Sequence, residues 1–145
     1  MNEEYKKLKL IDLCARLLYG VILKVSLYDE KVDNARLTGI DEDGYLTVDF
    51  PADCAFDIEE VKPFLRSISS MTEEEKEELK TLFDAEEITS DSICYLEGGT
   101  LEEYLSHISY SFCSKIIDWL NRHHFDYRGL IEKGLALEAL EGMYK

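Results

Sequence analysis

Residues that interrupt regular structure are scarce in this chain, which carries two prolines and eight glycines among 145 residues. Disordered and low-complexity chains are richer in both, so the scarcity favours a compact globular fold. No apolar run approaches the roughly 20 residues that cross a bilayer, and we expect no membrane span. The first residues lack the apolar segment of a secretory signal, so we expect a cytoplasmic protein.

Closely spaced cysteines and known catalytic motifs are also missing. Structural zinc sites draw ligands from close pairs such as CxxC, whereas here no cysteine lies within four residues of another. The chain has no phosphate-cradling loop, nucleophile elbow, paired-histidine zinc motif or dinucleotide fingerprint. We therefore predict no catalytic residue, no metal and no cofactor, and lean towards a protein that is not an enzyme. Free thiols are expected in a reducing compartment, at Cys14, Cys54, Cys94 and Cys113.

Basic residues are few, with 16 against 31 acids and a net charge of −15. Such a charge repels phosphate, so direct binding to DNA or RNA is not expected without a local basic patch. The sequence shows no such patch, and its nearest approach, Lys6, Lys7 and Lys9, follows Glu3 and Glu4. The acidic surface most simply keeps the protein soluble, but it also suits a basic partner or imitates nucleic acid.

The first half of the chain indicates one helix followed by short strands. Residues 3–18 have a partly periodic apolar face, and Gly20 has the position of a helix C-cap. Residues 21–28 alternate as a strand does, and residues 29–34 form a polar stretch that predicts a loop. Residues 35–40 and 45–50 flank Asp-Glu-Asp-Gly, which predicts a hairpin.

Residues 56–66 contain Pro63, which predicts a short strand or turn before it and an edge strand after it. Three or four short strands in this region predict a small antiparallel sheet or an SH3-like partial barrel. The next segment, residues 72–83, predicts a helix because Thr72 and Glu75 have the spacing of a capping box. The run at 73–75 is most simply a solvated helix start.

The longest helical pattern covers residues 100–121 and is apolar over much of its circumference, so we expect a helix buried on more than one side that serves as the hub of the fold. Residues 130–140 predict one more short helix. The expected fold class is α+β: a single domain over 1–145, with one helix, strands mainly over 20–66 and a helical C-terminal half over 70–145.

One ten-residue stretch holds the candidate binding residues. Two histidines, an aspartate and an arginine close together could bind an anion or a substrate that exchanges protons. The simpler interpretation is that they fasten the end of the long helix. Adjacent histidines lack the i,i+4 spacing of a helical metal pair, so a metal site is not predicted. The candidates are Trp119, His123, His124, Asp126, Tyr127 and Arg128.

The chain resembles a family of uncharacterised proteins from gut-dwelling bacteria and their phages. The resemblance rests on VKPFLRSISSMTEEEKEEL at 61–79, on DWLNRHHFDYRGLIEKGLALEALEGMYK at 118–145, and on Tyr19, Gly20 and Val21. It implies no reaction, cofactor or site residue. It implies a setting, a phage or integrated-element gene, in which small acidic proteins often bind and inhibit host enzymes.

The function that we expect is therefore a non-enzymatic protein-interaction module of phage or mobile-element type, in the host cytoplasm if a phage encodes it. Its partner would be another protein of host or phage, and we expect neither direct nucleic-acid binding nor a membrane. One alternative is an inhibitor of a host nucleic-acid-handling or defence enzyme that acts by acidic mimicry. A second alternative is a small ligand-binding protein or enzyme that uses the cluster at 119–128.

Overall fold

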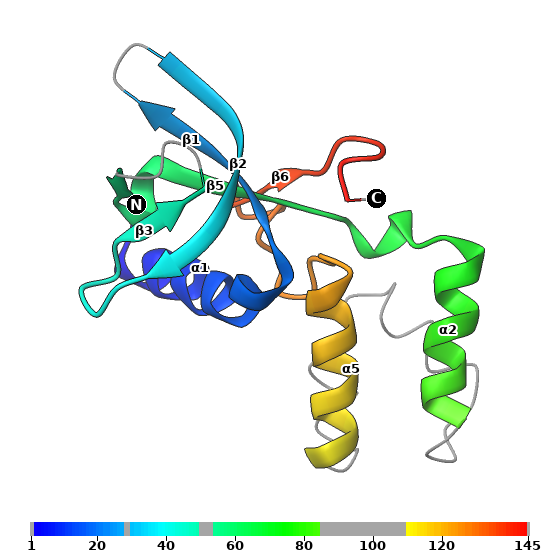
Figure 1. The fold of residues 1–145 in the computed structure, drawn as a ribbon. Coiled ribbons are helices and arrows are strands. Elements are labelled where there is room, and N and C mark those ends of the chain that lie inside the picture. Colours follow the sequence, from blue (N-terminus) through cyan, green and yellow to red (C-terminus); the bar gives the residue numbers. More distant parts are fainter. Residues whose placement is uncertain (1, 28–29, 50–53, 85–109, 145) are drawn as a thin grey trace. The chain divides into compact units, whose positions relative to one another are not determined.

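A computed structural model describes residues 2–27, 30–49, 54–84 and 110–144 (Figure 1). The chain divides into two compact units, here called the sheet unit (Met1–Leu65 and Arg128–Lys145) and the helical unit (Arg66–Tyr127). Each is described by itself, and the expectation of one domain stays a prediction. None of the described helices has the length and hydropathy to cross a membrane.

The sheet unit contains an open, mixed sheet in the order β4-β3-β2-β1-β5-β6. Neighbouring strands are antiparallel except β5 and β6, which run parallel. The α+β class is therefore confirmed, whereas the SH3-like partial barrel is not, because the sheet does not close. The strands are β1 (Ile22–Leu27), β2 (Glu30–Ile40), β3 (Leu46–Val48), β4 (Ala55–Phe56), β5 (Val61–Leu65) and β6 (Leu137–Glu138).

The predicted hairpin between β2 and β3 is confirmed. Asp41 donates its backbone N–H to the carbonyl of Tyr45 at 3.0 Å, and Gly44 supplies the positive φ of 84°. The predicted loop over 29–34 is wrong from residue 30 onwards, because β2 begins there and pairs with β1. Its polar composition favoured a loop, but backbone pairing with the preceding strand decided the outcome.

The predicted edge strand after Pro63 is also wrong, since β5 lies between β1 and β6 and includes Pro63 itself. Leu65 accepts a hydrogen bond from the N–H of Ala139 at 2.7 Å, which places its carbonyl on the β6 side. The backbone polar groups of every second residue in a strand point to the same side, so the backbone nitrogen of Pro63 also points towards β6. The pairing with β6 begins at Phe64, so the missing N–H of Pro63 costs no ladder hydrogen bond.

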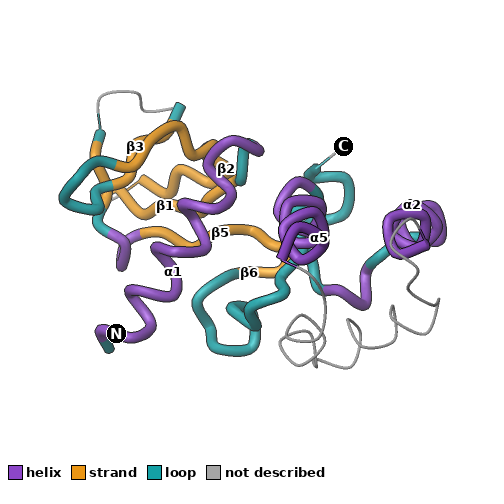
Figure 2. The backbone as a smooth tube through the Cα atoms, turned by 90° about the horizontal axis from the view of Figure 1, so that it is seen from below, coloured by secondary structure: helices purple, strands orange, loops and turns teal. Residues whose placement is uncertain are grey.

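The predicted N-terminal helix is confirmed as α1 (Glu3–Arg16), followed by the 3₁₀ turn η1 (Leu17–Tyr19). Gly20 ends this segment in the left-handed region, at φ 68°. α1 runs beside the strands (Figure 2) and contributes Leu13 to a core shared with the sheet. The buried core residues of the strands include Leu23, Val25, Ala35, Leu37, Leu46, Val48, Phe56, Val61 and Leu65.

The predicted helix over 130–140 is wrong, because this segment forms turns and the two-residue strand β6. Gly129 and Gly134 adopt φ of 73° and 74°, which interrupts any helix there. The Tyr144 hydroxyl accepts from the N–H of Ile22 at 2.9 Å and donates to the carbonyl of Phe64 at 2.6 Å. Contacts with distant strands, rather than local propensity, therefore shape the C-terminal segment, and a wholly helical C-terminal half is not confirmed.

The helical unit contains η3 (Ile68–Ser70), α2 (Glu73–Asp84) and α5 (Tyr110–Arg122). Residues 100–109 of the expected long helix lie outside the described residues. Ile116, Trp119 and Leu120 of α5 pack in a core of this unit with residues from α2 and from the segment after α5. The sheet unit's core includes no described residue of α5, and the expectation of this helix as the hub of the fold stays a prediction.

Candidate functional site

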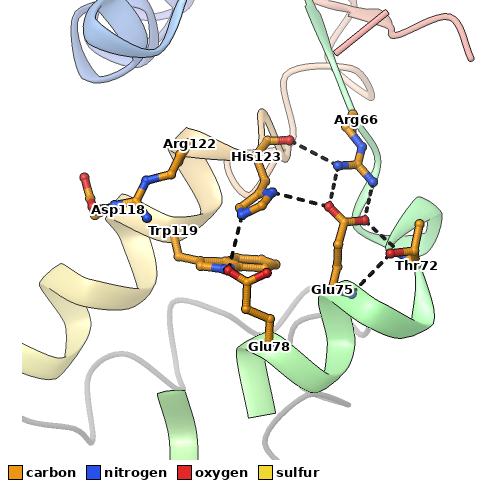
Figure 3. Close-up of polar contacts among 8 residues, drawn as sticks. All are labelled: Arg66, Thr72, Glu75, Glu78, Asp118, Trp119, Arg122 and His123. Atoms are coloured by element: carbon orange, nitrogen blue, oxygen red, sulfur yellow. Dashed lines mark hydrogen bonds and ion pairs between the residues drawn. The ribbon is translucent and has the colours of Figure 1, made fainter. Parts of the chain in front are cut away.

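The end of α5 places Trp119 and His123 one helical turn apart on the same face. Their ring centroids lie 4.3 Å apart with planes inclined at 37°. Trp119 is buried, and its indole N–H donates to Glu78 of α2 at 3.0 Å (Figure 3). Two of the six candidate residues are therefore in contact, within a wider cluster that joins α5 to α2.

Arg66 and Glu75 form the strongest ion pair of this cluster. Both terminal nitrogens of Arg66 donate to the carboxylate at 2.6 Å, and the Glu75 side chain is 14% exposed. Burial by itself raises the pKa of Glu75, but the hydrogen bonds from Arg66 and Thr72 and the charge of Arg66 together lower it to about 2. Glu75 is therefore ionised throughout the neutral range.

His123 lies between two carboxylates (Figure 3). Its Nδ1 is 3.4 Å from Glu75 Oε2, and its Nε2 is 3.8 Å from Glu78 Oε1. A carboxylate near each ring nitrogen orients the imidazole. The side chain is one quarter exposed. The arrangement therefore links the end of α5 to two carboxylates of α2.

Three candidate residues fasten the chain after α5. The Arg66 N–H donates to the carbonyl of His124, and the Asp126 N–H donates to the carbonyl of Arg66, both at 2.8 Å. His124 is buried and has a positive φ of 64°. The Tyr127 hydroxyl donates to Asn121 at 2.9 Å. These contacts match the simpler interpretation, in which the segment holds the helix end in place.

Arg128 belongs to the sheet unit, whereas the other five candidates belong to the helical unit. Its guanidinium donates to Asp12 at 2.8 Å, and Asp12 also accepts from Arg16 at 2.9 and 3.2 Å. Asp12 and Arg16 are fully buried. This second cluster is a buried charge network of the sheet unit.

Sequence reasoning missed Arg66, Glu75 and Glu78, which complete the cluster around His123. The interpretation of Glu75 as part of a solvated helix start is wrong, because the side chain is mostly buried. A usable signal was present in α2: Glu75 and Glu78 fall on the same helical face as Leu79, which is fully buried. Arg66 carried no comparable signal, since its partners come from distant segments.

The sheet unit also has an open cleft of about 320 Å³ beside the first half of α1. Lys6, which lines the cleft, forms ion pairs with Glu59 at 3.0 Å and Glu3 at 3.3 Å. Within the described ranges no three His, Cys, Asp or Glu side chains are placed to hold a metal ion. The cleft is lined by Glu3, Lys6, Lys7, Leu10, Asp43, Gly44, Tyr45, Asp57 and Ile58.

No protein-family model, curated protein or solved structure matches this chain. The resemblance to proteins of gut bacteria and their phages therefore stays a prediction.

Proposed function

We propose that this chain is a non-enzymatic protein-interaction module, cytoplasmic and of phage or mobile-element type. The supporting observation is that α1 and η1 expose apolar residues on the side opposite their buried charges. On one side the helix buries Lys9, Asp12 and Arg16, whose exposed fractions are zero. On the opposite side, α1 and η1 expose a stripe of apolar residues.

The exposed stripe consists of Ile11, Cys14 and Leu18, spaced three and four residues apart and so aligned along one face. Ile11 is 46% exposed and Leu18 is 89% exposed. Burying the Leu18 side chain against a partner would contribute about 1.5–3 kcal/mol, and burying the exposed half of Ile11 about half as much. Apolar residues at this spacing are the anchors by which a helix packs against an apolar face of another protein.

The partner that fits this stripe is a basic amphipathic segment of another protein. The chain carries a net charge of −15, so two copies repel each other while a cationic partner is attracted. Towards the helix N-terminus the line of the stripe continues to Lys7 and Glu4, which are both exposed and carry opposite charges. A partner with lysines or arginines beside its apolar face would match the stripe and the net charge of the chain.

The test uses a helical probe peptide of leucine and lysine and measures binding by fluorescence anisotropy. We expect the wild-type chain to bind and Leu18→Ser to bind at least about tenfold more weakly, because the main apolar contact is lost. Leu140→Ser is the matched control, since Leu140 is 64% exposed in the same unit but lies outside α1. Equal weakening by both substitutions, or by neither, would overturn the proposal.

A second candidate function, acidic mimicry of nucleic acid, is favoured by α2. Glu73 with Glu77, and Glu74 with Glu78, form two adjacent i,i+4 rows of exposed residues. Glu78 is partly engaged by Trp119, so the row is not wholly available. In a competition assay with a basic DNA-binding protein, Glu74→Gln with Glu77→Gln should weaken inhibition; inhibition unchanged by this pair would exclude the idea.

The ligand-binding or enzymatic alternative on residues 119–128 has less support. Both ring nitrogens of His123 face carboxylates of the chain, and Arg128 is bound to Asp12 in the sheet unit. The contacts observed for the cluster hold α2 and α5 together.

A further inference from the structure

The open cleft of about 320 Å³ in the sheet unit has three walls, and local hydrogen bonds fix the shape of each. The first wall is α1, which contributes four lining residues at the i, i+3, i+4 and i+7 spacing of one helical face. The second wall is the turn between β2 and β3, where the Asp41 carboxylate accepts from the N–H groups of Asp43 and Tyr45, both at 2.9 Å. The third wall is the 3₁₀ turn η2 (Ile58–Glu60), whose start is capped by Asp57. A ligand would therefore enter walls that are already in place, which lowers the cost of binding.

The lining of the cleft combines apolar and aromatic surface with an excess of acid. Leu10 and Ile58 are partly exposed, and Tyr45 is 45% exposed. The lining holds three acids and two lysines, and Glu59 adds a further acid through its ion pair with Lys6 at 3.0 Å. This charge favours a cation, and the apolar residues suit a cation that is carried on an aliphatic stem.

Asp43 supplies the carboxylate of the lining that is not already engaged. No ion pair joins Asp43 to another side chain within the described ranges. Glu3, by contrast, is paired with Lys6 at 3.3 Å, and the Asp57 side chain accepts from the backbone N–H of Glu59 at 3.0 Å. A cation that enters the cleft would therefore find its counter-charge at the turn between β2 and β3.

The cleft also lies next to the apolar stripe of α1. Lys7 lines the cleft and stands four residues before Ile11, in the line of the stripe. With 3.6 residues per turn, the row of residues that lines the cleft and the row that forms the stripe are about 60° apart around the helix. A segment packed along the stripe would therefore pass beside the cleft, within reach of a long side chain.

We propose that the cleft receives an arginine side chain of the basic partner segment that binds the α1 stripe, so this inference rests on the proposed function. The aliphatic stem packs against Leu10 and Ile58, and the guanidinium pairs with Asp43 beside Tyr45. Arginine suits this lining better than lysine, because its planar group gives two parallel hydrogen bonds to a carboxylate and stacks on aromatic rings. The stripe supplies the apolar contact, whereas the cleft selects among basic segments.

The test uses helical leucine–lysine peptides in which one residue beside the apolar face is arginine, lysine or norleucine, with its position scanned over two turns. Fluorescence anisotropy at low ionic strength measures their affinity for the full chain. We expect the wild type to bind the arginine peptide at least about threefold more tightly than the norleucine peptide at one position, with lysine between them, because the new ion pair is partly exposed. Asp43→Asn should remove this preference.

Glu42→Gln is the matched control, because it removes the same charge from the neighbouring residue of the turn, which is exposed and outside the lining. We expect this variant to keep the wild-type preference for arginine. Equal affinity of the arginine and norleucine peptides at every position, or a preference lost equally in the two variants, would overturn the cleft as an arginine site.

A second measurement separates this inference from the proposed function. N-acetylarginine amide has no apolar helical face, so its binding does not depend on the stripe, and the methyl NMR signals of Leu10 and Ile58 report it. Saturable shifts that Asp43→Asn abolishes, with peptide binding that Leu18→Ser leaves unchanged, would support the cleft and overturn the stripe. Peptide binding that Leu18→Ser weakens, without any preference for arginine, would overturn the cleft alone.

Discussion

The two units handle charge in opposite ways. The sheet unit buries Asp12, Arg16 and Lys9 completely and gives each of them a hydrogen-bond partner from the same unit. The helical unit keeps Glu75 and His123 at a rim, where both side chains remain partly exposed. The difference teaches that a charged cluster is not a functional site merely by being a cluster: the sealed Asp12–Arg16 network belongs to the interior of the fold, whereas the rim stays within reach of solvent.

The largest expected effect tests the sealed network. Asp12→Ala should lower the free energy of unfolding by about 3–5 kcal/mol, because it leaves the buried Arg16 and the partner Arg128 without their shared carboxylate. Urea unfolding followed by circular dichroism measures the loss. Asp118→Ala is the control, since its i,i+4 pair with Arg122 is exposed and should contribute less than about 0.5 kcal/mol. Similar losses in the two variants would remove the distinction between sealed and exposed charge.

The second-largest expected effect concerns the ion pair of Glu75 at the rim of the helical unit. The pKa of Glu75 is lowered from 4.5 to about 2, so its ionised form stabilises the fold above pH 4.5 and this contribution is lost as the pH falls towards 2. Glu75→Gln should therefore be less stable than wild type by about 3 kcal/mol at pH 7, with the difference vanishing near pH 2. Fluorescence of Trp119, the single tryptophan, reports unfolding of the helical unit. A stability difference between Glu75→Gln and the wild type that stays constant between pH 7 and pH 2 would contradict the ion-pair account.

The smallest effect has the opposite sign and returns to the sheet unit. Burial, with the nearby charge of Lys62, lowers the pKa of Lys9 from 10.5 to about 8. The cost of burying the ammonium is fully present below pH 8 and is relieved as the pH rises towards 10.5. Lys9→Met should therefore raise stability by about 2 kcal/mol at pH 7, less the lost hydrogen bond to Ile58, with a smaller gain at pH 10. Thermal unfolding at the two pH values measures it, and destabilisation at pH 7 would show that the hydrogen bond outweighs the burial cost.

Local signals predicted the elements that depend on neighbours in sequence. The capping box of α2 forms as expected, since Thr72 and Glu75 exchange hydrogen bonds at 3.0 and 3.2 Å. Gly20 ends η1 and Gly44 turns the hairpin, both at positive φ. Local signals did not predict the first residues of β2, the interior position of β5 or the C-terminal segment, because pairing with other strands determines them.

The candidate site was predicted only in part for the same reason. Trp119 and His123 could be found because they are close in sequence and share a helical face. Arg66 and Glu75 join them through contacts across more than forty residues, and no local pattern marks that approach. Arg128, by contrast, was grouped with them by sequence proximity although its partner is Asp12.

The sequence by itself determined the strongly negative charge, the amphipathic stretches and the caps, because composition and short-range spacing contain them. Only the tertiary structure decided which charges became buried partners. Asp12 and Arg128 show this most clearly: they are 116 residues apart in the sequence, and their side chains form a hydrogen bond of 2.8 Å. The physical reason is that local spacing determines which side chains share a face of one element, whereas contacts between segments far apart in the sequence depend on how the whole chain folds.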